Sequence, residues 1–83
     1  MWFGKYIKKK ALIWEISMSI ASYSHRLEKL RDSNLDFDVD ERLMLIGRID
    51  ALSLLAHDMG IENEVDRDSK MYLSRLVGFG HME

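Results

Sequence analysis

The stretch from Ala11 to Arg31 carries two apolar stripes at the spacing of an α-helix, and this feature limits the folds open to the chain. One stripe recurs at alternating intervals of three and four residues, as in a helix that turns one face toward a partner helix: Ile13, Ile16, Ile20, Tyr23, Leu27 and Leu30. The other stripe has the same spacing and lies nearly opposite on the helix: Ala11, Trp14, Met18 and Ala21. Because one neighbour cannot cover both sides, the N-terminal half of this helix needs two partners.

A second helix is predicted over residues 39–59, and it shows the same two-sided pattern. One face can meet the first stripe of the preceding helix: Leu45, Ile49, Leu52, Ala56 and Met59. The other face contains two small residues between two leucines: Leu43, Gly47, Ala51 and Leu54. A glycine inside a helix costs about 1 kcal/mol relative to alanine, so Gly47 indicates that another backbone comes close there.

Local signals predict where the second helix begins and ends. Asp38 is expected to cap its N-terminus, with Glu41 three residues later completing a capping box. Gly60 is a stop signal at its C-terminus, and Ile61 is the apolar residue that often accompanies such a stop.

The whole chain, residues 1–83, is therefore predicted to be one all-α domain. The first helix spans about 6–32, and the short connection to 39–59 predicts an antiparallel helical hairpin. A shorter third helix at about 64–77 completes a small helical bundle, and residues 78–83 are expected to form a frayed tail.

The excess of apolar helix surface predicts self-association. A chain of 83 residues buries only about 60% of its unfolded surface, and without cysteine it has no disulfide to add stability. A homo-oligomer, most simply an antiparallel dimer with a four-helix core, would cover the second stripes. The alternative is a monomer in which the third helix and the N-terminal aromatic residues cover them.

The N-terminal ten residues combine aromatic side chains with four lysines, although the net charge of the chain is −2. This segment could bind an anionic membrane surface or RNA, or could simply pack on the bundle. Glu15 interrupts the following apolar run, which argues against a signal peptide, and we expect a cytoplasmic protein. The candidate contact residues of this segment are Trp2, Phe3, Tyr6, Lys8, Lys9 and Lys10.

Motifs for catalysis or metal binding are not found in the sequence. Residues 36–40, DFDVD, begin like a calcium-binding loop, but Glu41 and Gly47 stand where such a loop needs glycine and glutamate. The serines lack the glycine-rich turn of a nucleophile elbow. The histidines are dispersed along the chain: His25, His57 and His81. We therefore expect no enzymatic activity, metal, cofactor or small-molecule substrate.

The remaining prediction is a small protein-binding module, such as an accessory regulator, an inhibitor or an assembly adaptor, that acts through apolar helix faces and as a homo-oligomer. The alternatives are an RNA-binding helical hairpin and a protein that associates with a membrane surface. Aromatic residues and methionine are favoured at protein interfaces. The candidate contact surface consists of the second stripes of both helices: Trp14, Met18, Leu43, Gly47, Ala51 and Leu54.

Overall fold

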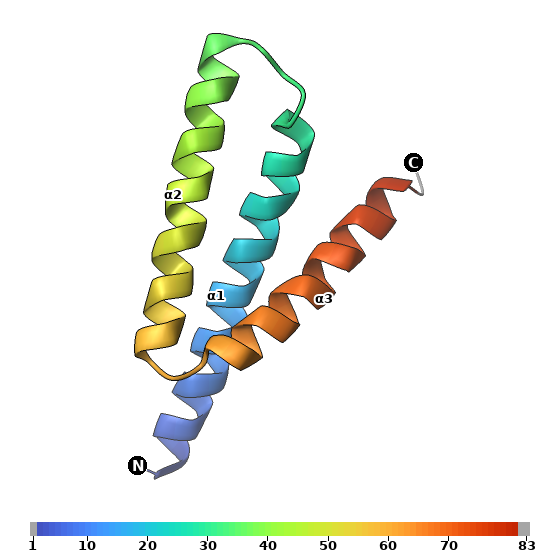
Figure 1. Ribbon diagram of the computed structural model, residues 1–83. Helices are drawn as coiled ribbons and strands as arrows, with labels where there is room; N and C mark the ends of the chain where they lie inside the picture. Colours follow the sequence, from blue (N-terminus) through green and yellow to red (C-terminus); the bar gives the residue numbers. More distant parts are fainter. Residues whose placement is uncertain (1, 82–83) are drawn as a thin grey trace.

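The computed structural model describes the backbone of residues 2–81 and the side chains of residues 8–78. Within this part of the chain the fold is all-α, with the helices α1 (Trp2–Leu30), α2 (Asp36–Asp58) and α3 (Glu62–His81) (Figure 1). The predicted all-α bundle of two long helices and a third one is thus confirmed.

The three helices differ from the predicted ranges at their ends. α1 begins before the predicted residue 6 and stops at Leu30, and α3 extends past both ends of the predicted range 64–77. Glu62 and Glu64 lie in the first turn of α3, where negative charge favours a helix N-terminus, so the helix begins earlier than expected. The frayed tail predicted at 78–83 is helical as far as His81, and residues 82–83 lie outside the described part.

α1 occupies the middle of the fold. α2 returns alongside α1, and α3 crosses α1 and diverges from α2 after the turn that joins them (Figure 1). The molecule extends 50 × 29 × 17 Å and is therefore long and thin. Because α2 and α3 hardly meet, most of the side of α2 that faces away from α1 is not covered by any described helix.

The core lies where the three helices meet, near the turn between α2 and α3. The predicted inner faces of α1 and α2 contribute most of it, and α3 adds Val65. Its buried members are Ile16, Ala56, Ile61 and Val65, with Leu12, Ile13, Ile20 and Leu52 packed around them. Met59, which was expected on the inner face of α2, is exposed because the helix ends there.

The connection between α1 and α2 corrects the predicted capping box. α2 begins at Asp36 with Leu35 as the N-cap residue, which makes no side-chain capping hydrogen bond. Asp38 lies inside the first turn and accepts a hydrogen bond of 2.6 Å from the Ser33 hydroxyl. Glu41 instead accepts hydrogen bonds from Arg26 of α1. Contacts with residues before the helix therefore replace the local cap.

The turn between α2 and α3 confirms the predicted stop. Gly60 has φ 73°, a conformation in which an L side chain is strained. Its N–H donates to the His57 carbonyl at 3.1 Å, and the Ile61 N–H donates to the Ala56 carbonyl at 2.9 Å. These two bonds form a Schellman motif. Ile61 is only 1% exposed, so the turn is anchored in the core.

Candidate interaction surface on α2

Exposed apolar side chains gather along the side of α2 opposite Leu45 and Ala56, the residues that α2 buries. At 3.6 residues per turn, they fall within an arc of about 120°. The large side chains on it are 44% to 69% exposed, with Phe37, Leu43 and Leu54 at the upper end. We call this surface the outer face of α2, and it comprises Phe37, Leu43, Met44, Gly47, Ala51, Leu54 and Leu55.

Two small residues lie at the centre of the outer face. Gly47 and Ala51 are both exposed, and a Cβ atom added at Gly47 would meet nothing within 4 Å. No close packing within the described chain therefore explains this glycine, although it weakens the helix by about 1 kcal/mol relative to alanine. Space for the close approach of another backbone exists above it.

Acidic residues lie on and beside the outer face. Asp36 and Asp40 are near its N-terminal end, Asp58 lies just beyond its C-terminal end and Asp50 flanks its centre, and all four are exposed. At 3.6 residues per turn, Asp40 and Asp58 point in the same direction as the face. Arg48 is turned toward α1, where its guanidinium carbon lies 5.6 Å from the centre of the Tyr23 ring. The Arg48 guanidinium therefore does not lie over the apolar centre of the face, around Gly47 and Ala51.

An ion pair joins α1 and α2 beside this surface. Arg26 donates hydrogen bonds of 2.9 and 3.2 Å to the two carboxylate oxygens of Glu41. These hydrogen bonds, and next the negative charge of Glu41, raise the pKa of Arg26 above its ordinary value. The pair is bidentate, which orients α2 relative to α1 and thereby fixes the direction of the outer face.

The predicted contact residues divide into two separate surfaces. Leu43, Gly47, Ala51 and Leu54 come together on the outer face of α2, as their spacing predicted. The predicted residues of α1 do not join them, because Trp14 lies about 160° around α1 from the core residue Ile16. Trp14 is 54% exposed and Met18 is half-buried.

α3 accounts for the other part of the second stripe of α1. Ala21 of this stripe and the neighbouring Ser17 are buried. α3 presents Val65 and Ser69, which are also buried, toward α1. The third helix therefore covers the second stripe of α1 in part and leaves the second stripe of α2 uncovered.

The basic N-terminal residues lie at a distance from the outer face. α1 projects beyond the turn between α2 and α3 (Figure 1). Lys8, Lys9 and Lys10, in the N-terminal part of α1, are exposed. Lys8 and Lys9 line a shallow hollow together with Leu12, Met59 and Ile61. The side chains of the other predicted contact residues lie outside the described set: Trp2, Phe3 and Tyr6.

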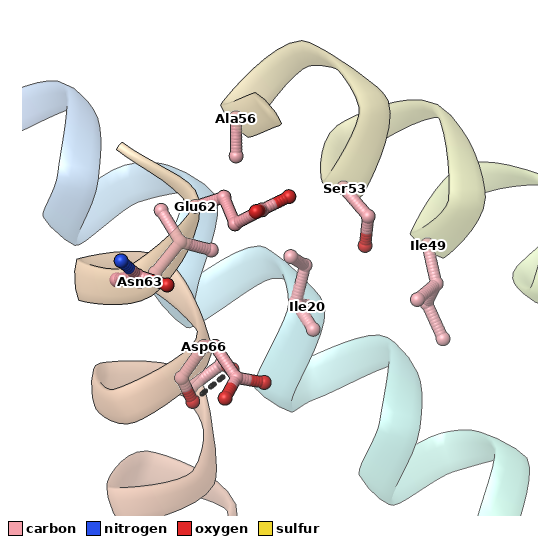
Figure 2. A pocket seen from close by; sticks show the side chains of 9 residues that line it. Ile20, Ile49, Ser53, Ala56, Glu62, Asn63 and Asp66 are labelled. Carbon is pink, nitrogen blue, oxygen red and sulfur yellow. Dashed lines mark hydrogen bonds between the residues drawn. The ribbon is translucent and has the colours of Figure 1, made fainter. Parts of the chain in front are cut away.

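A cleft of about 520 Å³ separates α2 from α3, with α1 as its floor (Figure 2). Its carboxylates are engaged with neighbours, because Glu62 lies 2.9 Å from His57 Nδ1 and Asp66 lies 3.1 Å from Lys70 Nζ. The sequence did not reveal this cleft, which depends on the angle at which α3 leaves α2. Its lining residues are Ile20, Ile49, Ser53, Ala56, Glu62, Asn63, Val65, Asp66 and Ser69.

The polar groups of the cleft form local pairs. Ser69 donates a hydrogen bond of 3.1 Å to the Asp66 carbonyl (Figure 2), so its hydroxyl is engaged within α3. Among the residues that the structure describes, no group of three or more His, Cys, Asp or Glu side chains is placed to hold a metal ion. The outer face of α2 is consequently the surface on which we base a function.

Comparisons with known proteins add no relative: no protein-family model matches the chain, and neither the curated proteins nor the solved structures contain a match.

Proposed function

We propose that this protein is a non-enzymatic helical module that binds another protein through the outer face of α2. The observation that carries the proposal is the alignment of five large, exposed apolar side chains on one side of one helix. Monomeric proteins seldom expose a contiguous apolar surface of this kind, and where they do it is commonly a binding site. An accessory regulator, an inhibitor or an assembly adaptor would act in this way.

The hydrogen bonds at both ends of α2 support the proposal. Arg42 fixes the connection before the helix through contacts with three backbone carbonyls, and the Schellman motif at Gly60 fixes its other end. α1 and α2 would act as an antiparallel hairpin in which α2 is already folded and oriented before a partner binds. A partner that binds a preorganised helix loses less conformational entropy than one that must order it.

A photo-reactive amino acid at Ala51, in the centre of the outer face, tests the proposal in the native cell. We expect a covalent adduct with a protein, a second copy of the chain included, and no adduct from the same probe at Ser74, an exposed position on α3. Leu54→Glu should abolish the adduct, whereas Met71→Glu, an equally drastic change at an exposed position of α3, should preserve it. The proposal is wrong if the Ala51 probe forms no adduct, or if both substitutions affect the adduct equally.

Two alternative functions depend on the exposed Lys8, Lys9 and Lys10 rather than on α2. These residues could hold the protein on an anionic membrane surface or on RNA. None of the helices, within the residues described, has the length and apolar content needed to cross a membrane. Binding to anionic vesicles or to single-stranded RNA that disappears when the three lysines are replaced by glutamine would favour one of these functions.

A further inference from the structure

We propose that the outer face of α2 binds the same face of a second copy of this chain, with the two α2 helices antiparallel and crossing at Gly47 and Ala51. This inference rests on the proposed function and names its partner. The surface contact would be isologous, which means that each copy contributes the same residues, as in most homodimers.

The first argument is the symmetry of the outer face about the level of Ile49. Its small residues, Gly47 and Ala51, lie two positions before and after Ile49. Four of its five large residues lie five and six positions away in each direction: Leu43 and Met44 before, Leu54 and Leu55 after; Phe37, twelve positions before Ile49, has no counterpart. A second copy turned end to end places small residues opposite small ones and large residues opposite large ones.

This pattern matches a close helix crossing. Small side chains at the centre let two helix axes approach to about 8 Å, the lower end of the usual range. The space above Gly47 is open, since an added Cβ atom would meet no neighbour. The large side chains on both sides of the crossing, which are Leu43 and Met44 of one copy and Leu54 and Leu55 of the other, then close over it.

The acidic ends of the face determine the crossing angle. Asp40 and Asp58 each lie nine residues from Ile49, or about 13 Å along the helix. In an antiparallel pair, Asp40 of one copy therefore lies opposite Asp58 of the other, and the two negative charges repel each other. At a crossing of about 50° the helix axes are about 14 Å apart at that level, compared with about 9 Å at 20°. The wider crossing therefore moves these carboxylates farther from one another and weakens their repulsion. We therefore expect a short, X-shaped contact and not a full-length coiled coil.

The accessible surface agrees with a missing partner. The chain exposes 6518 Å², whereas a compact monomer of 9.8 kDa is expected to expose about 5,200 Å². A stable interface of standard size removes about 800 Å² from each partner. The excess of about 1,300 Å² is spread over the elongated molecule, and the exposed apolar side chains of the outer face contribute to it. A net charge of −2 opposes the pairing only weakly.

Light scattering and sedimentation at protein concentrations from 1 to about 500 μM, a range that covers weak homodimers, test the pairing. We expect the wild type to dimerise and Gly47→Leu to remain monomeric with unchanged helix content, because the new side chain has room within one chain. Gly78→Leu is the matched control: its added Cβ also meets nothing, and it lies on α3, so it should still dimerise. A wild-type monomer at the highest concentration, or a Gly47→Leu variant that dimerises as well as the wild type, overturns the proposal.

Disulfide formation tests the orientation, because the chain contains no cysteine of its own. Mixing Met44→Cys with Leu54→Cys chains should give a mixed disulfide in preference to either homodisulfide. Antiparallel pairing about Ile49 places residue 44 opposite residue 54, whereas two copies of residue 44 lie about 15 Å apart along the helix, too far for a disulfide. Preferential 44–44 disulfides would indicate parallel helices and overturn the proposal.

The same experiments separate this inference from the proposed function. A wild-type monomer whose Ala51 probe forms an adduct with a different protein leaves the protein-binding function standing and removes the self-pairing. A wild-type monomer whose Ala51 probe forms no adduct removes both.

Discussion

Replacing Arg42 by methionine should destabilise the protein substantially, because this arginine closes the connection between α1 and α2. Its Nη1 atom lies 2.7 Å from the carbonyl oxygen of Leu30, 2.8 Å from that of Arg31 and 2.9 Å from that of Ser33. Nη1 has two hydrogens, so three oxygens share two donors and one hydrogen bond is bifurcated. The last carbonyls of a helix have no partner within the helix, and here an arginine of the next helix binds that of Leu30 together with two carbonyls of the connection.

The magnitude follows from two charge-assisted hydrogen bonds. Each such bond contributes about 1.5–3 kcal/mol when it is buried, and we take about 1–1.5 kcal/mol for each because Arg42 is only half-buried. Arg42→Met, which keeps most of the apolar stem, should therefore lower the free energy of unfolding by about 2–3 kcal/mol. A chain of 83 residues has about 4–12 kcal/mol in total. At 4–8 °C per kcal/mol, the melting temperature should fall by about 10–20 °C.

Thermal and urea unfolding followed by circular dichroism measures this change. Arg67→Met is the matched control, because Arg67 is exposed and its ion pair within the described part of the chain is with its neighbour Asp68 on the same helix. This substitution should change stability by less than about 0.5 kcal/mol. Both variants should be measured at two protein concentrations, since self-association would add to the apparent stability. A loss for Arg42→Met no larger than that for Arg67→Met would refute the role assigned to the three carbonyl contacts.

Three further substitutions test the turn between α2 and α3, the core and the outer face of α2, each by thermal unfolding at low protein concentration. Gly60→Ala should cost about 1–2 kcal/mol, because its φ of 73° is strained for a residue with a Cβ atom; an unchanged melting temperature would contradict this. Ile61→Ala should cost about 3 kcal/mol through the cavity it leaves beside Ala56, and a loss below 1 kcal/mol would show that the turn is not anchored in the core. Gly47→Ala should stabilise the monomer by about 0.5–1 kcal/mol, since the new methyl group meets nothing. A destabilised monomer would contradict the conclusion that the space beside Gly47 is open.

The sequence predicted the parts of the fold that depend on neighbouring residues. The spacing of Ile13, Ile16 and Ile20 placed one face of α1 in the core, and Gly60 ended α2 where expected. Both features follow from helical periodicity and from backbone conformation, which short stretches of sequence determine.

The start of α2 was predicted wrongly because distant residues decide it. Asp38 and Glu41 have the spacing of a capping box, but Ser33 donates to one of them and Arg26 to the other. Those contacts exist only after α1 and α2 have come together. The local pattern was therefore insufficient, and Arg42, the residue that holds the connection, had no recognisable motif around it.

The position of α3 was open for a similar reason. The second stripes of α1 and α2 were both candidates for its packing surface, and hydrophobicity alone did not distinguish them. Ser17 and Ala21 are small, lie one turn apart on α1 and are fully buried, so a helix can pack closely there. α2 carries a small pair at the same spacing, Gly47 and Ala51, so the small residues alone would not have placed α3 on α1 either.

The stability of a monomer does not account for the residues on the outer face of α2. Gly47 weakens the helix, and Leu43 and Leu54 are more than 60% exposed, so polar helix-forming residues would serve a monomer at least as well. Leu43→Gln together with Leu54→Gln should accordingly leave the free energy of unfolding of the monomer unchanged within about 0.5 kcal/mol. If these side chains instead contributed to a monomeric core, the double variant would lose several kcal/mol at every concentration. A loss that appears only at concentrations where the wild type associates would assign these leucines to the contact between copies.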